Sequence, residues 1–249
     1  MKIKDIYSYL DTICPFSTAC DFDNVGLLVG DMNATVTKAV VVLDCTSAAV
    51  EFARKQSAEL IITHHPVIFG GIKSVTAETP VYKAIKNGIS VLAAHTNLDS
   101  AEGGVNDILA AALGLTDIKK VVCPDGFAFR CGTLPSIMTA DELARYAAER
   151  LHSNARYVCG KKPIKTLAVC GGSGWDMCDI AIAAGADAFL TSEVKHHAFL
   201  EAKEKGVTLL DLGHFATERV IVNALTEKLK ENIKNVEFIP FDDELIKHL

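Results

Sequence analysis

Two adjacent histidines, His64 and His65, follow an apolar run and are followed at once by Pro66. Imidazole is a common ligand for transition metals, and a polar ring is costly to bury without a partner. Neighbouring side chains point to opposite faces within a strand, but the backbone turns at a strand end, where two imidazoles can diverge toward two metal ions. Pro66 restricts His65 to extended conformations and keeps this exit rigid. The pair predicts a metal site at the end of a strand.

Two histidine–carboxylate pairs share a spacing of four residues. His214 and Glu218 lie where a long amphipathic helix is expected to begin, and an i, i+4 pair occupies one helical face. His95 and Asp99 repeat this spacing. An exposed ion pair of little energetic value is the alternative reading of the His214–Glu218 pair. The repetition favours a shared metal site.

The metal-ligand candidates are therefore His64, His65, Asp99, His214 and Glu218. Two ions of about four to six positions each require roughly eight to twelve donors, so positions remain for water, hydroxide or substrate. Open positions are typical of catalytic metal sites. With no sulfur ligand evident, Zn, Fe, Mn and Co are all admissible. The sequence predicts two divalent metal ions per subunit and a metal-dependent hydrolase.

Further polar residues follow other predicted strands. Glu193 and His95 are candidate catalytic residues, as a proton carrier and as a group that contacts the substrate. His196 and His197 are candidate substrate-binding residues. The alternatives are a hydrogen-bonded structural role for His95 and an exposed helix for the segment that contains the other three.

A glycine-rich segment, CGGSGWD at 170–176, lies between an expected strand and an expected helix. A helix N-terminus in this context can hold an anion. The segment lacks the glycine spacing of the known nucleotide-binding loops, so it is a weak indication of a nucleotide site. A tight turn from strand to helix explains it equally well.

Short apolar runs alternate with segments of helical spacing. Strands are expected at 38–45, 59–63, 89–94, 166–170, 187–191, 207–212 and 236–241. Helices are expected at 46–57, 78–87, 101–113, 139–151, 176–184, 194–205 and 216–232. This alternation predicts an α/β protein with mostly parallel strands.

The chain contains an internal sequence repeat. NGISVLAAHTNLD at 87–99 and KGVTLLDLGHFATE at 205–218 share a glycine, an apolar strand, a histidine and an acid four residues after it. Upstream, AELIITHH at 58–65 matches ADAFLTSE at 186–193 more loosely. A segment rich in glycine and proline, 123–136, interrupts the alternation. We expect two α/β domains with similar halves and the dinuclear metal site in the cleft between them.

Composition limits the partners and the compartment. A net charge of −6 in 249 residues argues against binding to nucleic acid or to an anionic membrane. The eight cysteines form no Cys-x-x-Cys pair, which disfavours a structural zinc site. The N-terminus is interrupted by charges, unlike a signal peptide, and no apolar run is long enough to span a membrane. These features predict a cytoplasmic protein.

The motifs together resemble the Ngg1-interacting-factor-3-like family, whose members are also named GTP cyclohydrolase 1 type 2 homologues. The matching segments are DNVGLLVGD, ITHHPVIF, HTNLDSAEGGVNDILAAALGL, GGSG with GADAFLTSE, and DLGHFATE, in order from about residue 4 onward. The resemblance implies a dinuclear metal site on the same five residues and a ring-shaped homohexamer. It also implies opening of the imidazole ring of GTP with loss of formate, so the expected partner is a small-molecule substrate, a nucleotide.

The resemblance also bears on the domains. The DNVG segment and the last ligand-bearing helix belong with the first domain, which predicts a metal-binding domain of 1–123 plus 213–249 and a second domain of 124–212. The more usual Thr-Gly-Glu is Thr191-Ser192-Glu193 here, and the opening of the second domain is altered to GFAFRCG at 126–132. Two other functions stay open. One is a non-catalytic oligomeric protein that binds metal or regulates a partner, and the other is a metal-dependent phosphoesterase.

Overall fold

The computed structural model describes residues 1–243. By their contacts, these residues form two compact units, one of residues 1–102 and 221–243 and one of Gly103–Val220. The first unit is therefore interrupted in the sequence by the second. The domain boundaries expected from the sequence, 1–123 with 213–249 and 124–212, stay a prediction, and positions 244–249 lie outside the described residues.

The first unit contains a five-stranded sheet in the order β1-β4-β3-β2-β11. Its strands are β1 (Gly26–Val29), β2 (Lys38–Asp44), β3 (Leu60–His65), β4 (Ser90–Ala93) and β11 (Glu237–Phe241). All neighbours pair in parallel except β1, which is antiparallel to β4. Its helices are α1 (Ile3–Ile13), η1 (Phe16–Thr18), α2 (Ser47–Lys55), α3 (Pro80–Lys86), α4 (Thr96–Ser100) and α10 (Val220–Asn232).

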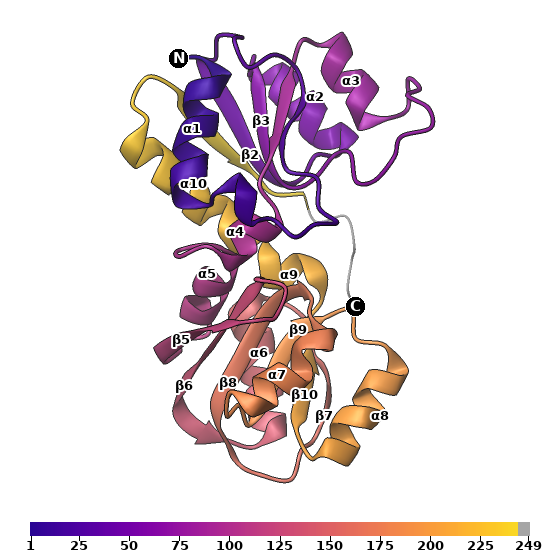
Figure 1. Ribbon diagram of the computed structural model, residues 1–249, viewed down its shortest axis with the longest axis vertical. Coiled ribbons are helices and arrows are strands. Elements are labelled where there is room, and N and C mark those ends of the chain that lie inside the picture. The colour runs from indigo at the N-terminus through magenta and orange to yellow at the C-terminus, as the bar shows by residue number, and fades with distance from the viewer. Residues whose placement is uncertain (244–249) are drawn as a thin grey trace. The chain divides into compact units, whose positions relative to one another are not determined.

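Helices cover both faces of the first sheet, with α2 and α3 on one side and α1 and α10 on the other (Figure 1). A parallel sheet covered in this way has strands that are apolar along their whole length. Val40 and Val42 of β2 accordingly pack in one core cluster with Ala49 of α2. Threonine side chains cap the N-termini of both α2 and α3, at Thr46 and Thr79. The capped helix starts and the buried strands are thus both consistent with a parallel sheet covered by helices on its two faces.

The second unit contains a six-stranded sheet in the order β5-β6-β8-β9-β10-β7. Its strands are β5 (Thr116–Val122), β6 (Ala128–Met138), β7 (Arg156–Val158), β8 (Ile164–Ser173), β9 (Ala188–Ser192) and β10 (Thr208–Asp211). Strands β8, β9 and β10 are parallel, and the other pairs are antiparallel. Its helices are α5 (Val105–Ala112), α6 (Ala140–Leu151), η2 (Trp175–Met177), α7 (Cys178–Ala183), α8 (His196–Lys205) and α9 (His214–Glu218).

The core of the second unit lies against β8. Leu143 and Ala147 of α6 pack in one cluster with Leu167 and Val169 of β8. A capping box between Thr139 and the glutamate three residues on begins α6. None of the helices in the described chain is long and apolar enough to cross a bilayer.

The two sheets share a pattern. Strands β2, β3 and β4 are neighbours in chain order and parallel, as are β8, β9 and β10, and an antiparallel strand borders β4 and β10 in turn. This similarity matches the repeated sequence segments and confirms the prediction of an α/β protein with two similar halves. The polar clusters lie at or just after the carboxyl ends of β3, β4, β9 and β10, where parallel sheets place ligand-binding residues.

The segment 123–136 is a turn followed by most of β6, although its glycines and prolines break the alternation of the sequence. Pro135 lies where the register between β6 and β8 shifts, between Thr133 and Met138. A proline lacks the N–H that a regular ladder uses, so an irregular stretch accommodates it. The composition of this segment therefore marks a distorted strand.

Candidate metal centre

His64, at the end of β3, is almost fully buried, with 1% of its side chain exposed. Its Nδ1 lies 3.0 Å from the carbonyl oxygen of Ala94. A carbonyl only accepts, so Nδ1 donates and Nε2 carries the lone pair of the neutral ring. That Nε2 lies 3.4 Å from Oδ1 of Asp99, which is itself buried. Two lone-pair donors that face each other in a buried place fit a cation that both can bind.

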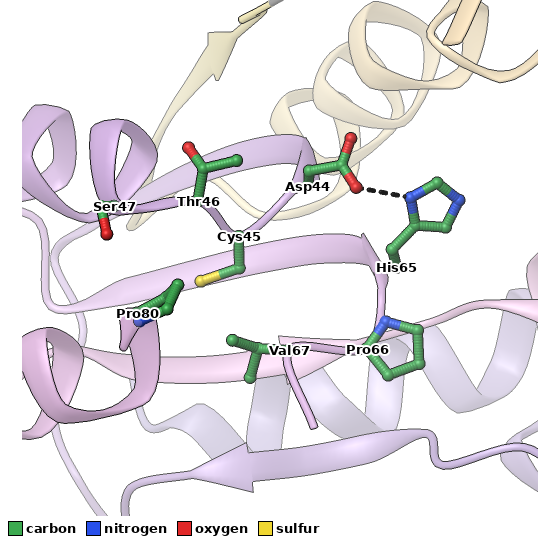
Figure 2. A pocket seen from close by; sticks show the side chains of 8 residues that line it. All are labelled: Asp44, Cys45, Thr46, Ser47, His65, Pro66, Val67 and Pro80. Atoms are coloured by element: carbon green, nitrogen blue, oxygen red, sulfur yellow. Dashed lines mark hydrogen bonds and ion pairs between the residues drawn. The ribbon is translucent and has the colours of Figure 1, made fainter. Parts of the chain in front are cut away.

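His65 is fixed by a carboxylate instead of a carbonyl. Its Nδ1 lies 2.7 Å from Oδ1 of Asp44, the last residue of β2, and these two residues are partners in the β2–β3 register. Figure 2 shows this contact at the edge of a pocket of about 350 Å³. The pocket is lined by Asp44, Cys45, Thr46, Ser47, His65, Pro66, Val67 and Pro80. With Nδ1 donating to this carboxylate, the lone pair of a neutral His65 ring lies on Nε2, and the ring borders a space that can hold a ligand.

His95 comes directly after β4 and contacts a buried aspartate. Its Nδ1 lies 2.9 Å from Oδ1 of Asp23, and Oδ2 of Asp23 accepts from the backbone N–H of Thr96 at 3.0 Å. Burial raises the pKa of Asp23, but the hydrogen bonds from His95 and Thr96 outweigh it and hold that pKa well below its usual range. His64, His65 and His95 each offer one ring nitrogen within 4.8 Å of the others, a group that can hold a metal ion.

In the second unit, His214 begins α9 and joins two carboxylates. Its Nε2 lies 2.9 Å from Oε2 of Glu218, and its Nδ1 lies 3.0 Å from Oε1 of Glu193. Glu218 is 3% exposed, whereas Glu193 is more than half exposed. The i, i+4 spacing thus puts His214 and Glu218 on one face of α9, as predicted. Glu193 holds the far side of the ring, and its role in proton transfer stays a prediction.

Glu193 has a left-handed backbone, with φ of 54°. A residue other than glycine adopts this conformation only when its surroundings impose it, and such residues gather at functional sites. The preceding strand β9 is buried throughout, so the chain turns sharply where it leaves the sheet. This turn brings the Glu193 carboxylate to Nδ1 of His214.

The glycines at the end of β8 leave room for the Glu218 side chain, because a side chain at these positions would collide with it. A Cβ atom on Gly172 would collide with Oε1 of Glu218 and lie 3.2 Å from Nε2 of His214, and one on Gly171 would lie 3.1 Å from Cγ of Glu218. The backbone N–H of Gly172 also donates to Oγ1 of Thr217, at 3.2 Å. These glycines are therefore explained by close packing against the candidate metal ligands.

Replacing Gly172 by alanine is expected to weaken metal binding by about 10–100-fold, the range typical of changes just outside a metal's ligands. The added methyl group displaces the Glu218 carboxylate and strains a backbone with φ of +63°. Gly185→Ala is the matched control, because its φ is +91° and no atom lies within 4 Å of the added carbon. Calorimetric titration with Zn²⁺ should separate the two variants, and equal affinities would contradict this reading of the loop.

The two candidate substrate-binding histidines lie elsewhere on the second unit. His196 and His197 form the exposed first turn of α8. Neither belongs to a group of possible metal ligands among residues 1–243. Their role in substrate binding stays a prediction.

Sequence reasoning missed the residues that orient the histidines. Asp23 lies in the DNVG motif, whose sequence carries the family resemblance but indicates no chemical role by itself. Asp44 ends an apolar strand, and nothing in the local sequence indicates a functional role for it. Its contact with His65 depends on the pairing of β2 with β3. Gly172 lies in the glycine-rich segment 170–176, whose sequence indicates only a weak nucleotide site. Each acts through a contact that only the folded chain makes.

Comparisons with known proteins agree with this fold. The model of the Duf34/NIF3 (NGG1p interacting factor 3) family matches residues 1–244. A Clostridium perfringens (strain 13 / Type A) protein named GTP cyclohydrolase 1 type 2 homolog is 36% identical over 250 residues, which cover 96% of this chain and 95% of that protein. A Clostridium acetobutylicum protein of the same name is 35% identical and covers 92% of this chain and 90% of its own.

A solved structure is similar over the whole length. The crystal structure of Staphylococcus aureus protein SA1388 has a TM-score of 0.90 and 30% sequence identity, covering 100% of this chain and 99% of that one. The structure of reduced HcgD from Methanocaldococcus jannaschii has a TM-score of 0.82 and 28% sequence identity. The match covers 96% of this chain and 97% of that one. The order and spacing of the histidine and carboxylate motifs, the two-sheet fold and these matches lead to one assignment: the chain belongs to the Duf34/NIF3 (NGG1p interacting factor 3) family.

Proposed function

We propose that this protein is a metal-dependent hydrolase with two divalent ions, bound by His64, His65, Asp99, His214 and Glu218. The observation that carries the proposal is the hydrogen bonding of the histidines. Each of these rings has Nδ1 against a protein oxygen, and Nε2 of both His64 and His214 faces a buried carboxylate. Metal-binding histidines have this arrangement, in which an oxygen partner fixes the ring and leaves the other nitrogen for the ion.

The donor set also limits the metal. Nitrogen and carboxylate oxygen suit Zn²⁺, Mn²⁺, Fe²⁺ or Co²⁺, and no cysteine belongs to a group of possible ligands within the described residues. Five donors leave two ions with open positions. Such ions lower the pKa of bound water to about 7 and polarise a substrate oxygen, which is the chemistry of hydrolysis. The chain's own residues hold the ions and shape the pocket beside His65.

We further propose that the substrate is a nucleotide and that the reaction is opening of the guanine imidazole ring of GTP. Relatives of this chain are named GTP cyclohydrolase 1 type 2 homolog, which supports a purine nucleotide. Two water molecules are consumed as both bonds from C8 to ring nitrogens break. The carbon leaves as formate, and the two nitrogens keep the protons that water supplies.

The assembly and the compartment are part of the same proposal. The family resemblance favours a homohexamer, which size-exclusion chromatography with light scattering would test directly. We place the protein in the cytoplasm, where its eight cysteines would stay reduced. The acidic net charge of −6 supports a small-molecule substrate over nucleic acid.

The decisive experiment measures metal and products together. Bound metal in the purified protein is quantified by mass spectrometry, and the chelated protein is reloaded separately with Zn²⁺, Mn²⁺, Fe²⁺ and Co²⁺. Each form is incubated with GTP and with a panel of phosphate esters, while formate and phosphate are followed. Formate from GTP only in a reloaded form supports the cyclohydrolase. Metal-dependent phosphate release identifies a phosphoesterase, and bound metal without any turnover identifies a binding protein.

Chelation is expected to lower the melting temperature by roughly 10 °C. A ligand present at about a thousand times its Kd stabilises the folded state by about 4 kcal/mol, and 1 kcal/mol shifts the melting temperature of a chain of this size by about 2–4 °C. Differential scanning calorimetry before and after EDTA treatment measures the shift. Zn²⁺ should restore it and Mg²⁺ should not, because Mg²⁺ prefers oxygen ligands. An unchanged melting temperature would show that the protein holds no tightly bound metal.

A further inference from the structure

Two phenylalanine side chains of the first unit are exposed, although phenylalanine is among the residues most often buried. Phe22 is 68% exposed and Phe69 is 59% exposed. They come from different loops, one before β1 and one after β3, and their rings meet edge to face with centroids 6.5 Å apart and an interplanar angle of 72°. Single exposed apolar side chains need no explanation, but a contiguous pair indicates a binding surface.

Hydrogen bonds hold the two loops in place. Nδ2 of Asn24 donates to the carbonyl oxygen of Ile68 at 2.7 Å, which ties the loop before β1 to the chain just before the second phenylalanine. Asp23, the neighbour of Phe22, accepts the backbone N–H of Thr96 at 3.0 Å. Both rings are therefore carried by tethered backbone. Preorganisation of this kind lowers the entropic cost of binding a ligand.

The aromatic pair lies beside the candidate metal centre. The ring centroid of Phe69 is 6.1 Å from that of His95, with an interplanar angle of 89°. The His95 ring in turn lies 5.1 Å from the ring of His64 and 5.5 Å from that of His65. The exposed apolar surface thus begins directly next to the side chains proposed to hold the ions. This continuity favours a part of the substrate as its occupant over a remote partner.

The proposed reaction requires a flat ring at this place. It opens the imidazole ring of a purine, so the purine has to lie beside the ions. Exposed aromatic side chains bind nucleic-acid bases by stacking, which contributes about 5–150-fold in affinity per base. Stacking tolerates different bases, because each of them has a π face.

We infer that Phe22 and Phe69 form a stacking platform for the purine ring of the substrate. The inference rests on the proposed function for the reaction and deepens it by naming residues that bind the substrate's base. The platform selects for a planar heteroaromatic ring and discriminates little between purines. Removing it should weaken binding of the base and leave the metal content unchanged.

The test compares two probes that differ only in the base. Guanosine 5′-monophosphate (GMP) and ribose 5-phosphate are titrated calorimetrically into the zinc-loaded, full-length protein. Phe69→Leu and Phe22→Leu keep an apolar side chain but lose the ring, and each should weaken GMP binding by about 10-fold or more. The affinity for ribose 5-phosphate and the zinc content should not change. In turnover of GTP, the KM should rise by a similar factor while kcat is retained.

The controls separate stacking from a structural role. Phe69→Trp keeps an aromatic face, so it should bind GMP at least as tightly as wild type, and the bound base should quench the added tryptophan fluorescence. Ile85→Ala removes another exposed apolar side chain of the first unit, on α3, and should leave GMP affinity unchanged. Circular dichroism checks the fold of each variant, and light scattering checks its assembly.

The outcomes distinguish this inference from the proposed function. Unchanged GMP affinity and KM in both leucine variants would overturn the platform and leave the metal-dependent hydrolase standing. If these variants instead lose their assembly while GMP affinity is kept, the surface is a contact between copies of the chain, and the inference is wrong. A wild type that binds zinc but neither GMP nor GTP would overturn the platform and the nucleotide substrate together. A protein that holds no metal but binds GMP through these phenylalanines would overturn the proposed function alone.

Discussion

Replacing Glu218 by glutamine should leave the protein folded and reduce the affinity for its weaker-bound ion by at least about 100-fold. Glu218 is 3% exposed and lies 2.9 Å from Nε2 of His214, so its carboxylate is a direct candidate ligand with little access to solvent. Glutamine keeps the shape of the side chain and removes its charge. Losing a ligand should exceed the roughly 10–100-fold effect of losing an outer partner. Under the proposed function, any formate production from GTP should fall with metal occupancy.

The measurement pairs metal stoichiometry with turnover. Mass spectrometry of protein dialysed against defined Zn²⁺ concentrations gives the number of ions and their affinities. Glu204→Gln, on the exposed face of α8, is the matched control and should retain wild-type metal content. A Glu218→Gln variant that keeps both ions at wild-type affinity would remove Glu218 from the metal centre.

The second large effect concerns stability. Replacing Asp107 by asparagine should lower the free energy of unfolding by about 3–5 kcal/mol, the usual cost of breaking a buried ion pair from one side. Arg130 is 2% exposed, and its Nη2 donates to Oδ2 of Asp107 at 2.9 Å while its Nε donates to Oδ1. Asparagine keeps the shape of the side chain but removes the negative charge opposite the buried guanidinium. Urea unfolding followed by circular dichroism measures the change.

A double variant provides the control for this pair. Asp107→Leu with Arg130→Met replaces both charges by apolar groups, and such replacements of buried pairs are often neutral or stabilising. The double variant should therefore be more stable than Asp107→Asn alone. If the single variant unfolds at the same urea concentration as wild type, the pair contributes little to stability.

The same pair predicts how stability depends on pH. Burial raises the pKa of Asp107, but the hydrogen bonds from Arg130 and from the N–H of Gly103 outweigh it, so that pKa is lowered. A carboxyl whose pKa is lower in the folded state stabilises the protein above its ordinary pKa of about 3.9. This contribution should be lost as the pH falls below that value. Asp107→Asn should lose stability less steeply than wild type in this acid range.

The sequence predicted the buried parallel strands well, whereas the partly buried β6 was missed because its segment is rich in glycine and proline. Strands β2, β3, β4, β8, β9 and β10 are continuous apolar runs, and each was expected within a few residues of its position. Strand β5 was missed because all but one of its residues are exposed and it contains two lysines, as edge strands often do. Strand β7 has three residues, too few to show a period. Burial leaves a pattern in a sequence, and edge pairing does not.

The site was predictable to the same degree. Residue types and spacing were enough to select the histidines and carboxylates, because metal ligands come from a short list of side chains. The roles of Asp23 and Asp44 depend on contacts with His95 and His65 across 72 and 21 positions of the chain. No local pattern records such pairings. The ligands can therefore be read from the sequence, and the groups that orient them cannot.

Cys45 lines the pocket beside His65 (Figure 2). Burial, aided by the charge of Asp44, raises the pKa of the Cys45 thiol to about 12. Peroxides and alkylating agents attack thiolates, and a thiol with so high a pKa is almost never ionised at neutral pH. If the proposed ions are held by nitrogen and oxygen alone, the centre offers oxidants no thiolate to attack, unlike sites in which thiolates hold zinc.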